Sequence, residues 1–383
     1  MRVLHLMLSN FYIDNVNYQE NIIPIMNYQA GHDVRIIAST EVFVKENKLG
    51  YTQPSEYKTA EGISVIRLPY ESISNNLFAR KIRSYPNLYQ HICEFEPDII
   101  LFHGAAGWAL HTVSKYKKHN PHIKLYVDSH EDKYNSARNF VSRIVLYECF
   151  YNQILRKNIK HIDKLLYITK DTYNFIRDVY KIAESKLEFF PLGGIIPDEN
   201  ERLKFRNKIR EEYGLSENDI LCIHSGKMDS GKRTFEILKG FSEFKGGNVK
   251  LLIIGSADKE VEEEIKKYSI DERIYYLGWM QSERLQHFLM AADLYIQLGS
   301  QSATMQQALC NGCVAAVYPY ESHTYLLKDK ACYIQSAKDI TQLLKDISIN
   351  VVNFSEIREK STQLAKDILD YKVISNKIIS GFN

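Results

Sequence analysis

The sequence predicts an α/β protein built from two doubly wound domains. Apolar runs typical of buried strands alternate with amphipathic helical segments in both halves of the chain, and a Pro- and Gly-rich segment at 190–197 interrupts the alternation. A length of 383 residues also exceeds what one ordinary hydrophobic core holds. We therefore expect domains at 1–190 and 191–355, and a helical segment at 356–383 able to pack back on the first domain.

The first half carries six expected strands. A βαβ unit opens the chain, with a strand over 2–8, a helix over 18–30 and a strand over 34–38. Helical patterns separate most of the remaining strands, which favours a parallel sheet. These remaining strands are expected at 63–68, 97–103, 124–128 and 164–168.

Two small-residue turns of the second half follow expected strands. A basic turn, 226–232, follows the strand at 220–225, and a hydroxyl-rich loop lies within 293–305 between a strand and a helix. Further strands are expected at 249–254 and 274–277. Open α/β sheets bind ligands at the carboxyl ends of their strands, and helix N-termini there suit phosphate. The pattern predicts a phosphorylated, nucleotide-linked ligand.

Composition and charge narrow the class of protein. Lys and Arg number 49 against 47 Asp and Glu, and a net charge of +2 argues against a nucleic-acid binder. Six scattered cysteines, with no secretory pattern before the first strand, favour a cytoplasmic setting. No apolar run approaches the roughly 18 residues that span a bilayer. Basic helical segments at 80–83 and 156–160 leave peripheral contact with the cytoplasmic face of a membrane open.

The basic turn also has the Gly-x4-Gly-Lys spacing of a Walker A loop. Arg233 stands where Ser or Thr would bind magnesium, however, and Thr234 comes one place late. The next core strand ends at Gly255 without an acidic residue. A P-loop NTPase is therefore the less favoured reading.

Gly226, Lys227 and Lys232 resemble the Gly-Arg/Lys-x4-Lys signature of GT-B glycosyltransferases of the family-4 type (glycosyl transferases group 1). Other segments with the family's pattern follow in its order, at 251–255, 274–278, 291–295 and 308–312. The resemblance implies a GT-B fold, in which two Rossmann-like domains face each other across a cleft. It further implies sugar transfer from a nucleotide diphosphate sugar, with a UDP-sugar expected, to a hydroxyl of a glycan or lipid-linked glycan in bacterial surface-polysaccharide synthesis.

The resemblance also assigns roles to single residues. Lys227 and Lys232 would contact the donor diphosphate, Trp279 and Met280 would lie at the nucleobase, and His130 would face the donor sugar. His103 and Gly104 end the preceding strand on the same rim. The family works without a bound metal or other cofactor and retains anomeric configuration. The absence of an Asp-x-Asp motif agrees with the lack of a metal.

The chain departs from the family at two glutamates eight positions apart, which Gly299 and Gln307 replace. Gln307 can still form hydrogen bonds with ribose hydroxyls, but glycine cannot replace the carboxylate on the sugar side. The departure leaves open a catalytically silent chain that binds a glycan or a partner enzyme. Donor contacts are expected instead from the loop between them, with Ser300, Ser302, Ala303 and Thr304.

Polar side chains fill the loop after the first strand. The family often has a Gly-Gly turn here, which this chain lacks. The segment is compatible with a polar lining for an acceptor and equally with a capped helix behind a solvated loop. Its polar members are Asn10, Asn15, Asn17, Tyr18 and Gln19.

Overall fold

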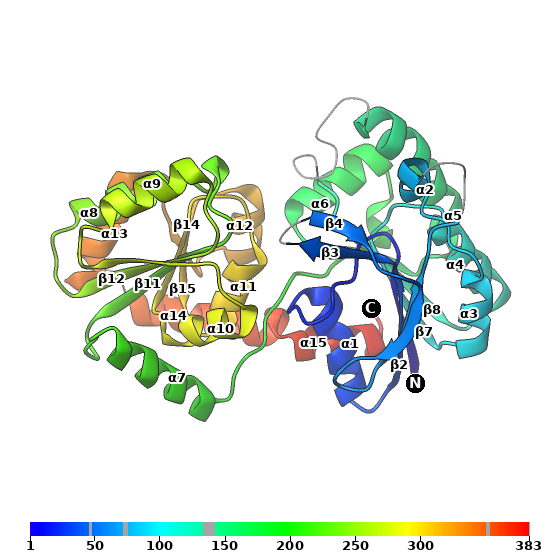
Figure 1. The fold of residues 1–383 in the computed structure, drawn as a ribbon, viewed down its shortest axis with the longest axis horizontal. Coiled ribbons are helices and arrows are strands. Elements are labelled where there is room, and N and C mark those ends of the chain that lie inside the picture. Colours follow the sequence, from blue (N-terminus) through cyan, green and yellow to red (C-terminus); the bar gives the residue numbers. More distant parts are fainter. Residues whose placement is uncertain (46–47, 72–75, 133–141, 350–352, 383) are drawn as a thin grey trace. The chain divides into compact units, whose positions relative to one another are not determined.

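The computed structural model describes residues 1–45, 48–71, 76–132, 142–349 and 353–382. The chain divides into two compact α/β units (Figure 1), of which unit 1 comprises Met1–Pro191 and Ile374–Asn383 and unit 2 comprises Leu192–Val373. The chain thus returns to unit 1 at residue 374, later than the predicted 356. The reason is that α14 (Phe354–Leu364) packs on α11 (Ala303–Cys310) and β15 (Val314–Val317) within unit 2.

Unit 1 is built on an eight-stranded sheet in the order β10-β9-β8-β7-β1-β2-β6-β5. All neighbours pair in parallel except β5 with β6, so the expectation of a purely parallel sheet is wrong at this edge. A separate hairpin of β3 (Glu41–Lys45) and β4 (Lys48–Tyr51) was also not predicted. The sheet strands are β1 (Arg2–Met7), β2 (Asp33–Ser39), β5 (Ser55–Lys58), β6 (Ser64–Leu68), β7 (Ile99–His103), β8 (Lys124–Ser129), β9 (Lys164–Tyr167) and β10 (Leu187–Phe189).

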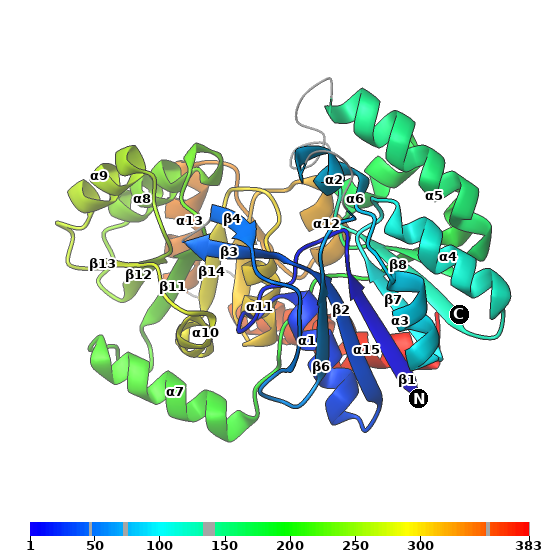
Figure 2. The same ribbon diagram turned by 45° about the vertical axis from the view of Figure 1, so that its right-hand side comes forward.

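Helices cover both faces of this sheet. Helices α1 (Gln19–Gln29) and α15 (Tyr371–Ser380) lie on one face, and α3 (Leu88–Phe95), α4 (Ala109–His119) and α5 (Asn152–Asn158) lie on the other (Figures 1 and 2). The direction in which consecutive strands are added reverses between β1 and β7. Such a switch point is where open α/β sheets leave a crevice at the carboxyl ends of their strands. Shorter helical segments are α2 (Asn76–Ile82), α6 (Lys170–Phe175) and a π-helix at Ser142–Tyr151.

Unit 2 has a six-stranded, fully parallel sheet in the order β13-β12-β11-β14-β15-β16, with its switch point between β11 and β14. Helix α8 packs against α9 and α13, and α10 packs against α7 and α11. The strands are β11 (Ile220–Ser225), β12 (Val249–Ile254), β13 (Ile274–Gly278), β14 (Leu294–Gln297), β15 and β16 (Cys332–Tyr333). The helices are α7 (Glu199–Glu212), α8 (Thr234–Glu243), α9 (Lys259–Tyr268), α10 (Ser282–Ala291), α11, α12 (Glu321–Leu327), α13 (Ala337–Ser348) and α14.

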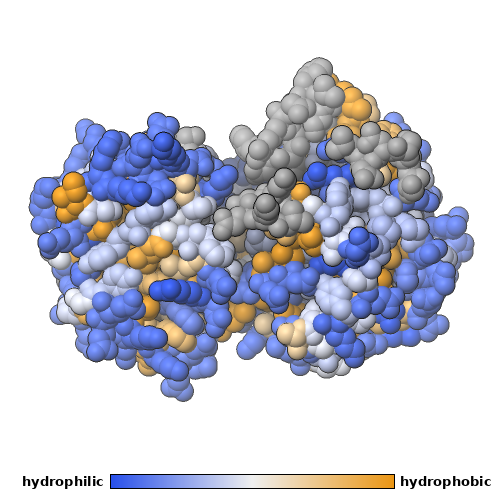
Figure 3. Space-filling view, viewed as in Figure 1, coloured by the Kyte–Doolittle hydropathy of each residue, from blue (hydrophilic) through white to orange (hydrophobic). Residues whose placement is uncertain are grey.

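Within the described parts of the chain, no helix has both the length and the apolar character needed to cross a bilayer. On the face drawn in Figure 3, apolar residues lie in small patches among polar ones.

Candidate functional site

The basic turn of unit 2 begins at Gly226, immediately after β11, and packs closely against the backbone of Gly255. Gly226 and Gly255 adopt φ angles of +134° and +143°. A Cβ atom on Gly255 would stand 1.8 Å from the carbonyl oxygen of Gly226. The Met228 amide donates to the Ser256 carbonyl at 2.8 Å. The ends of β11 and β12 are therefore held together by backbone contacts that admit no side chain.

Lys232 brings the two predicted loops together at the switch point. A Cβ atom on Gly226 would lie 3.9 Å from the Lys232 Nζ, and one on Gly299 would lie 3.0 Å from its Cδ. Burial lowers the pKa of Lys232, and Asp229 only partly offsets this. Neither Lys227 nor Lys232 forms an ion pair with another described residue. A largely buried ammonium group without a carboxylate partner suits an anionic ligand.

The packing around Gly299 gives a physical reason for the absence of a glutamate there. Besides the Lys232 side chain, a Cβ atom at this position would meet the Gly231 carbonyl oxygen and the Lys232 Cα, each at 3.2 Å. These are backbone atoms of the basic turn and cannot simply rotate away. A glutamate at position 299 would therefore displace the turn that carries Lys232.

The loop after β14 is held by a residue that the sequence analysis did not identify, the buried Gln297. Its Nε2 donates to the carbonyl oxygens of Gly299, at 3.3 Å, and of Ser300. Its Oε1 accepts from the Ser302 hydroxyl at 2.8 Å and lies 3.2 Å from the Tyr295 hydroxyl. One amide thus fixes the whole loop against the strand that precedes it.

The predicted donor-binding residues of this loop differ in availability. The Ser302 hydroxyl caps the N-terminus of α11, accepting from the Met305 amide at 3.4 Å, so it serves the fold first. Ser300 is exposed, and Ala303, Thr304 and Gln307 are half-buried. Beyond β13, Trp279 is 70% exposed and follows Gly278 in the left-handed region, with the half-buried Met280 next to it.

His224, a second residue without a predicted role, ties the start of α8 to the sheet. Its Nδ1 lies 2.9 Å from the Ile296 carbonyl oxygen and its Nε2 lies 3.1 Å from the Thr234 hydroxyl. Burial lowers the pKa of His224 to about 4, so the ring is neutral, Nδ1 donates and Nε2 accepts. Thr234 is buried and engaged by this bond, so the hydroxyl considered for magnesium in a P-loop is not available for that role.

At the switch point of unit 1, a row of polar side chains runs from the core to the surface. His5 of β1 contacts Asn27 (Nε2–Oδ1, 3.1 Å) and His103 (Nδ1–Nε2, 3.2 Å). His103 meets Asp128 (Nδ1–Oδ2, 2.6 Å), and Asp128 contacts His130 (Oδ1–Nε2, 3.3 Å). All but His130 are fully or almost fully buried, and the His130 side chain is 21% exposed.

The hydrogen-bond partners of His5 indicate where its ring proton lies. The Asn27 amide nitrogen donates to the Ser375 carbonyl, so its Oδ1 accepts from His5 Nε2. Burial and the neighbouring His103 lower the pKa of His5 to about 3, so the ring is neutral and its Nδ1 accepts from His103. The other nitrogen of His103, Nδ1, lies 2.6 Å from Asp128 Oδ2, so the buried ring joins the neutral His5 to the Asp128 carboxylate.

His130 is held as a cation at neutral pH by the carboxylates around it. Burial alone would lower the pKa of His130, but the Asp128 carboxylate, with Glu20 and Glu131, raises it to about 9. Burial would likewise raise the pKa of Asp128, yet His103 and His130 hold it well below its usual value. Among the described residues no hydrogen bond reaches His130 Nδ1. The ring can thus offer a charged donor, not a general base.

Several of these residues share a sequence signal. His5 and His224 are polar residues within mostly apolar strands, Gln297 is the last residue of β14, and Asp128 is the last residue but one of β8. Such residues are expected to find hydrogen-bonding partners within the fold because an unpaired buried polar group is costly. The sequence therefore indicates that these side chains form hydrogen bonds within the fold, but only the structure identifies their partners.

Residues 205–351 match the family model described as "Glycosyl transferases group 1". The chain is also 21% identical over 158 residues, 40% of its length, to N-acetyl-alpha-D-glucosaminyl L-malate synthase of Bacillus anthracis, and the alignment spans 39% of that relative. The segment that matches the family model lies within unit 2.

Solved structures similar to the whole chain establish the fold. Anabaena Alr3699/HepE, crystallised in complex with UDP, matches with a TM-score of 0.68 at 12% identity, covering 99% of both chains. WaaG, a glycosyltransferase involved in lipopolysaccharide biosynthesis, matches with a TM-score of 0.63 at 16% identity, covering 99% of this chain and 100% of that one. The two Rossmann-like units are those of the GT-B glycosyltransferase fold.

Proposed function

We propose that this chain, in which a segment of unit 2 matches the glycosyl transferases group 1 model, transfers a sugar from a nucleotide diphosphate sugar to a hydroxyl of a glycan or lipid-linked glycan. The observation that carries the proposal is the Lys232 ammonium group, largely buried at the switch point without a carboxylate partner. UDP is the first candidate nucleotide because a structure of the same fold binds it. A role in bacterial surface-polysaccharide synthesis is the candidate pathway, supported by the similarity to WaaG.

In the proposed reaction, protein cations replace a metal ion at the leaving group. Lys227 and Lys232 stabilise the negative charge that develops on the diphosphate as the bond to the sugar breaks. Gln307 holds ribose hydroxyls, and Trp279 lies beside the base. His130, cationic at neutral pH, donates a hydrogen bond to the donor sugar. Retention of anomeric configuration is proposed from the family resemblance.

The main alternative is a silent GT-B chain that binds a glycan or a partner enzyme. The replacement of both family glutamates, by Gly299 and Gln307, motivates it. It predicts weak or absent nucleotide binding together with glycan binding. The P-loop NTPase is disfavoured because Thr234 is buried and bonded to His224.

A thermal-shift screen with UDP, GDP, CMP, dTDP and ADP and their sugar conjugates, without metal and then with magnesium, separates these functions. Metal-independent stabilisation by one diphosphate family, followed by donor turnover, supports the transferase and names its base. A ligand at 100 times its Kd stabilises the folded state by about 2.7 kcal/mol, which is readily seen. No shift with any nucleotide favours the silent chain, and a shift that requires ATP or GTP with magnesium favours the NTPase.

A further inference from the structure

Three arginines surround one buried carboxylate at the amino-terminal edge of the unit 2 sheet. Asp293, which immediately precedes β14, is 5% exposed. Its Oδ1 accepts from Arg206 at 2.9 Å and from Arg358 at 3.0 Å. Its Oδ2 accepts from Arg210 and from the Leu221 amide, each at 3.0 Å. Side chains from two helices, α7 and α14, therefore converge on a single acceptor group.

The positive charge of this cluster exceeds its negative charge. Burial would raise the pKa of Asp293, but the arginines around it lower the pKa below its ordinary value, so the carboxylate is ionised. A carboxylate offers about four lone-pair positions, and the four donors fill them. Among the described residues, Asp293 is the one carboxylate paired with these three arginines. An excess of two positive charges therefore remains.

Arg358 keeps donors that the described parts of the chain do not use. Its Nη2 donates to Asp293, whereas its Nε is buried without a hydrogen-bond partner and its Nη1 bonds to no described residue. The guanidinium lies over the Phe354 ring, 5.2 Å from its centroid. Because Arg206 and Arg358 contact the same oxygen atom, their terminal nitrogens are close enough to bond one further oxyanion together.

Arg202, one turn before Arg206 on α7, adds a fourth guanidinium to this edge. Burial and Asp293 raise the pKa of the neighbouring Cys313 thiol to about 12, while Arg358, Arg206 and Arg202 all act to lower it. All three guanidinium groups thus lie near the same buried sulfur atom. Arg202 pairs with Glu199 at 3.3 Å, but this carboxylate is 69% exposed and neutralises the cluster only weakly.

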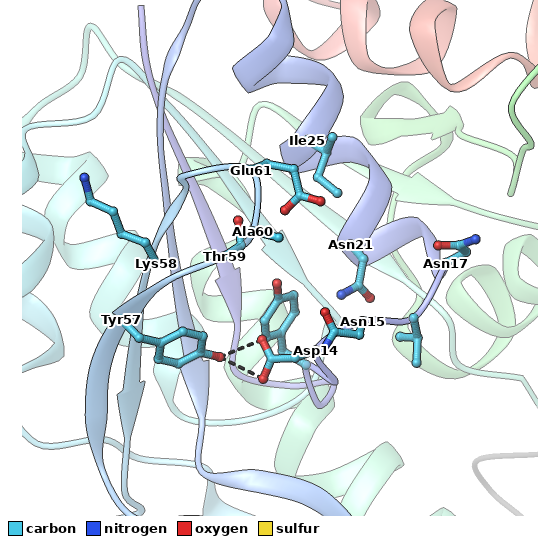
Figure 4. Close-up of a pocket in the computed structure, with 12 residues that line it drawn as sticks. Asp14, Asn15, Asn17, Asn21, Ile25, Tyr57, Lys58, Thr59, Ala60 and Glu61 are labelled. Carbon is cyan, nitrogen blue, oxygen red and sulfur yellow. Dashed lines mark hydrogen bonds between the residues drawn. The ribbon is translucent and has the colours of Figure 1, made fainter. Parts of the chain in front are cut away.

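The polar pocket of unit 1 shows the balanced case (Figure 4). There the Asp14 carboxylate pairs with the buried Arg67 at 2.7 Å and accepts from the Tyr57 hydroxyl at 2.7 Å. The remaining charged residues of the lining are Lys58 and Glu61. Two cations thus accompany two carboxylates in that pocket, whereas the Asp293 cluster has more cations than anions.

We propose that Arg202, Arg206 and Arg358 bind a small phosphate-bearing anion at a site separate from the proposed donor site. Guanidinium groups match phosphate oxygens in geometry, and a phosphate group carries about two negative charges at pH 7, equal to the excess. The three side chains are 18% to 34% exposed, so a small soluble anion reaches them more readily than a flat lipid surface does. The site lies at the opposite end of β14 from Gln297 and its loop, and it does not depend on the proposed transferase function.

A phosphate titration of the full chain at constant ionic strength, followed by phosphorus NMR, tests this site. Arg358→Gln removes the charge with unused donors, and Asp293 keeps Arg206 and Arg210 as partners, so the protein should stay folded. Arg284→Gln is the matched control, since Arg284 is exposed on α10 with its guanidinium 6.0 Å from the Phe288 ring centroid. Thermal unfolding without phosphate checks the fold of each variant.

Lys232→Met separates this site from the proposed donor site, which could also attract phosphate. Acetate serves as the monocarboxylate probe, and phosphatidylglycerol vesicles serve as the lipid-bound source of phosphate. UDP binding is followed in parallel by thermal shift.

Phosphate should bind the wild-type chain, Arg284→Gln and Lys232→Met with similar affinity, and Arg358→Gln about tenfold more weakly. Absence of phosphate binding, equal binding by Arg358→Gln, or loss of binding in Lys232→Met would overturn the proposal. So would acetate binding as tight as that of phosphate, or binding to the vesicles without binding to free phosphate. UDP stabilisation should be the same in Arg358→Gln as in the wild type. If UDP fails to bind any of the proteins while phosphate still distinguishes Arg358→Gln, the transferase proposal fails and the anion site stands.

Discussion

The switch points of the two sheets are organised in opposite ways. In unit 1, the edge between β1 and β7 is filled by ion pairs that the protein supplies itself, from the buried His103–Asp128 pair to His130 and Glu20. In unit 2, the edge between β11 and β14 consists of close-packed glycine turns and a largely buried Lys232 that lacks a carboxylate partner. The first edge is electrostatically complete and presents a fixed charged donor. The second presents a cation that forms no ion pair with a carboxylate of the described residues.

The largest expected effect comes from removing the central charge of the unit 1 edge. Asp128→Asn removes the carboxylate of the buried His103–Asp128 pair and should destabilise the protein by about 3–5 kcal/mol. It also removes the main charge that raises the pKa of His130, which should fall below its present value of about 9. Urea unfolding and NMR titration of the histidine ring signals measure the two effects.

Asp163→Asn is the matched control for this substitution. Asp163 also accepts a backbone hydrogen bond, from Leu125 at 2.8 Å, and pairs with Lys117, but its side chain is 29% exposed. Loss of the Asp163 carboxylate should therefore lower the free energy of unfolding by about 1 kcal/mol. Equal destabilisation by the two substitutions would show that the buried Asp128 carboxylate stabilises the fold no more than the partly exposed Asp163 carboxylate does.

The unit 2 edge should respond in the opposite manner, losing function without losing stability. Lys232→Met removes an ammonium group whose burial Asp229 offsets only in part, so the free energy of unfolding should stay the same or rise. Donor turnover should fall by about 10²- to 10³-fold if the charge stabilises the leaving diphosphate. Lys239→Met, at an exposed position of α8, should change neither. Wild-type turnover in Lys232→Met would remove the basis of the diphosphate assignment.

Much of the fold was predictable because buried parallel strands leave a strong apolar signal. The strands at 220–225 and 249–254 were expected with the bounds observed for β11 and β12. β5, with the sequence Ser-Glu-Tyr-Lys, was missed because it is a largely exposed edge strand without an apolar run. The late return of the chain to unit 1 was missed because a helical pattern does not specify which unit the helix packs against.

The loops that form the site could be predicted from the sequence, but their positions relative to one another could not. Strand order cannot be read from local patterns, so the sequence could not show that the turn at Lys232 and the loop at Gly299 flank the same switch point. The protonation of His130 could likewise not be predicted, because its pKa depends on Asp128, Glu20 and Glu131, which lie around it only in the folded chain. These contacts join segments far apart in the chain.

Substitutions at Gly299 test how rigidly the basic turn of unit 2 is held. Gly299→Glu would restore the glutamate of the family pattern, yet we expect it to weaken UDP binding about tenfold, because its Cβ would push against the backbone of the basic turn. Gln307→Glu, the other reversion, places no new atom against the turn and should leave UDP binding within about threefold of wild type. Isothermal titration with UDP measures both. Tighter binding by Gly299→Glu would mean that the turn moves freely and is not preorganised.

The smallest effect is expected from pH within the physiological range. Since the folded-state pKa of His130 is about 9 and its ordinary value is 6.5, its stabilising contribution is fully present below pH 6.5 and is lost as the pH rises through 9. If the cation donates to the sugar, turnover attributable to this group should change less than about twofold between pH 6.5 and 8.5 and fall tenfold per pH unit well above 9. His130→Gln should lower turnover and remove that alkaline limb while keeping UDP affinity. An alkaline limb that persists in His130→Gln would assign the titration to another group, such as Lys232, whose pKa is lowered by burial.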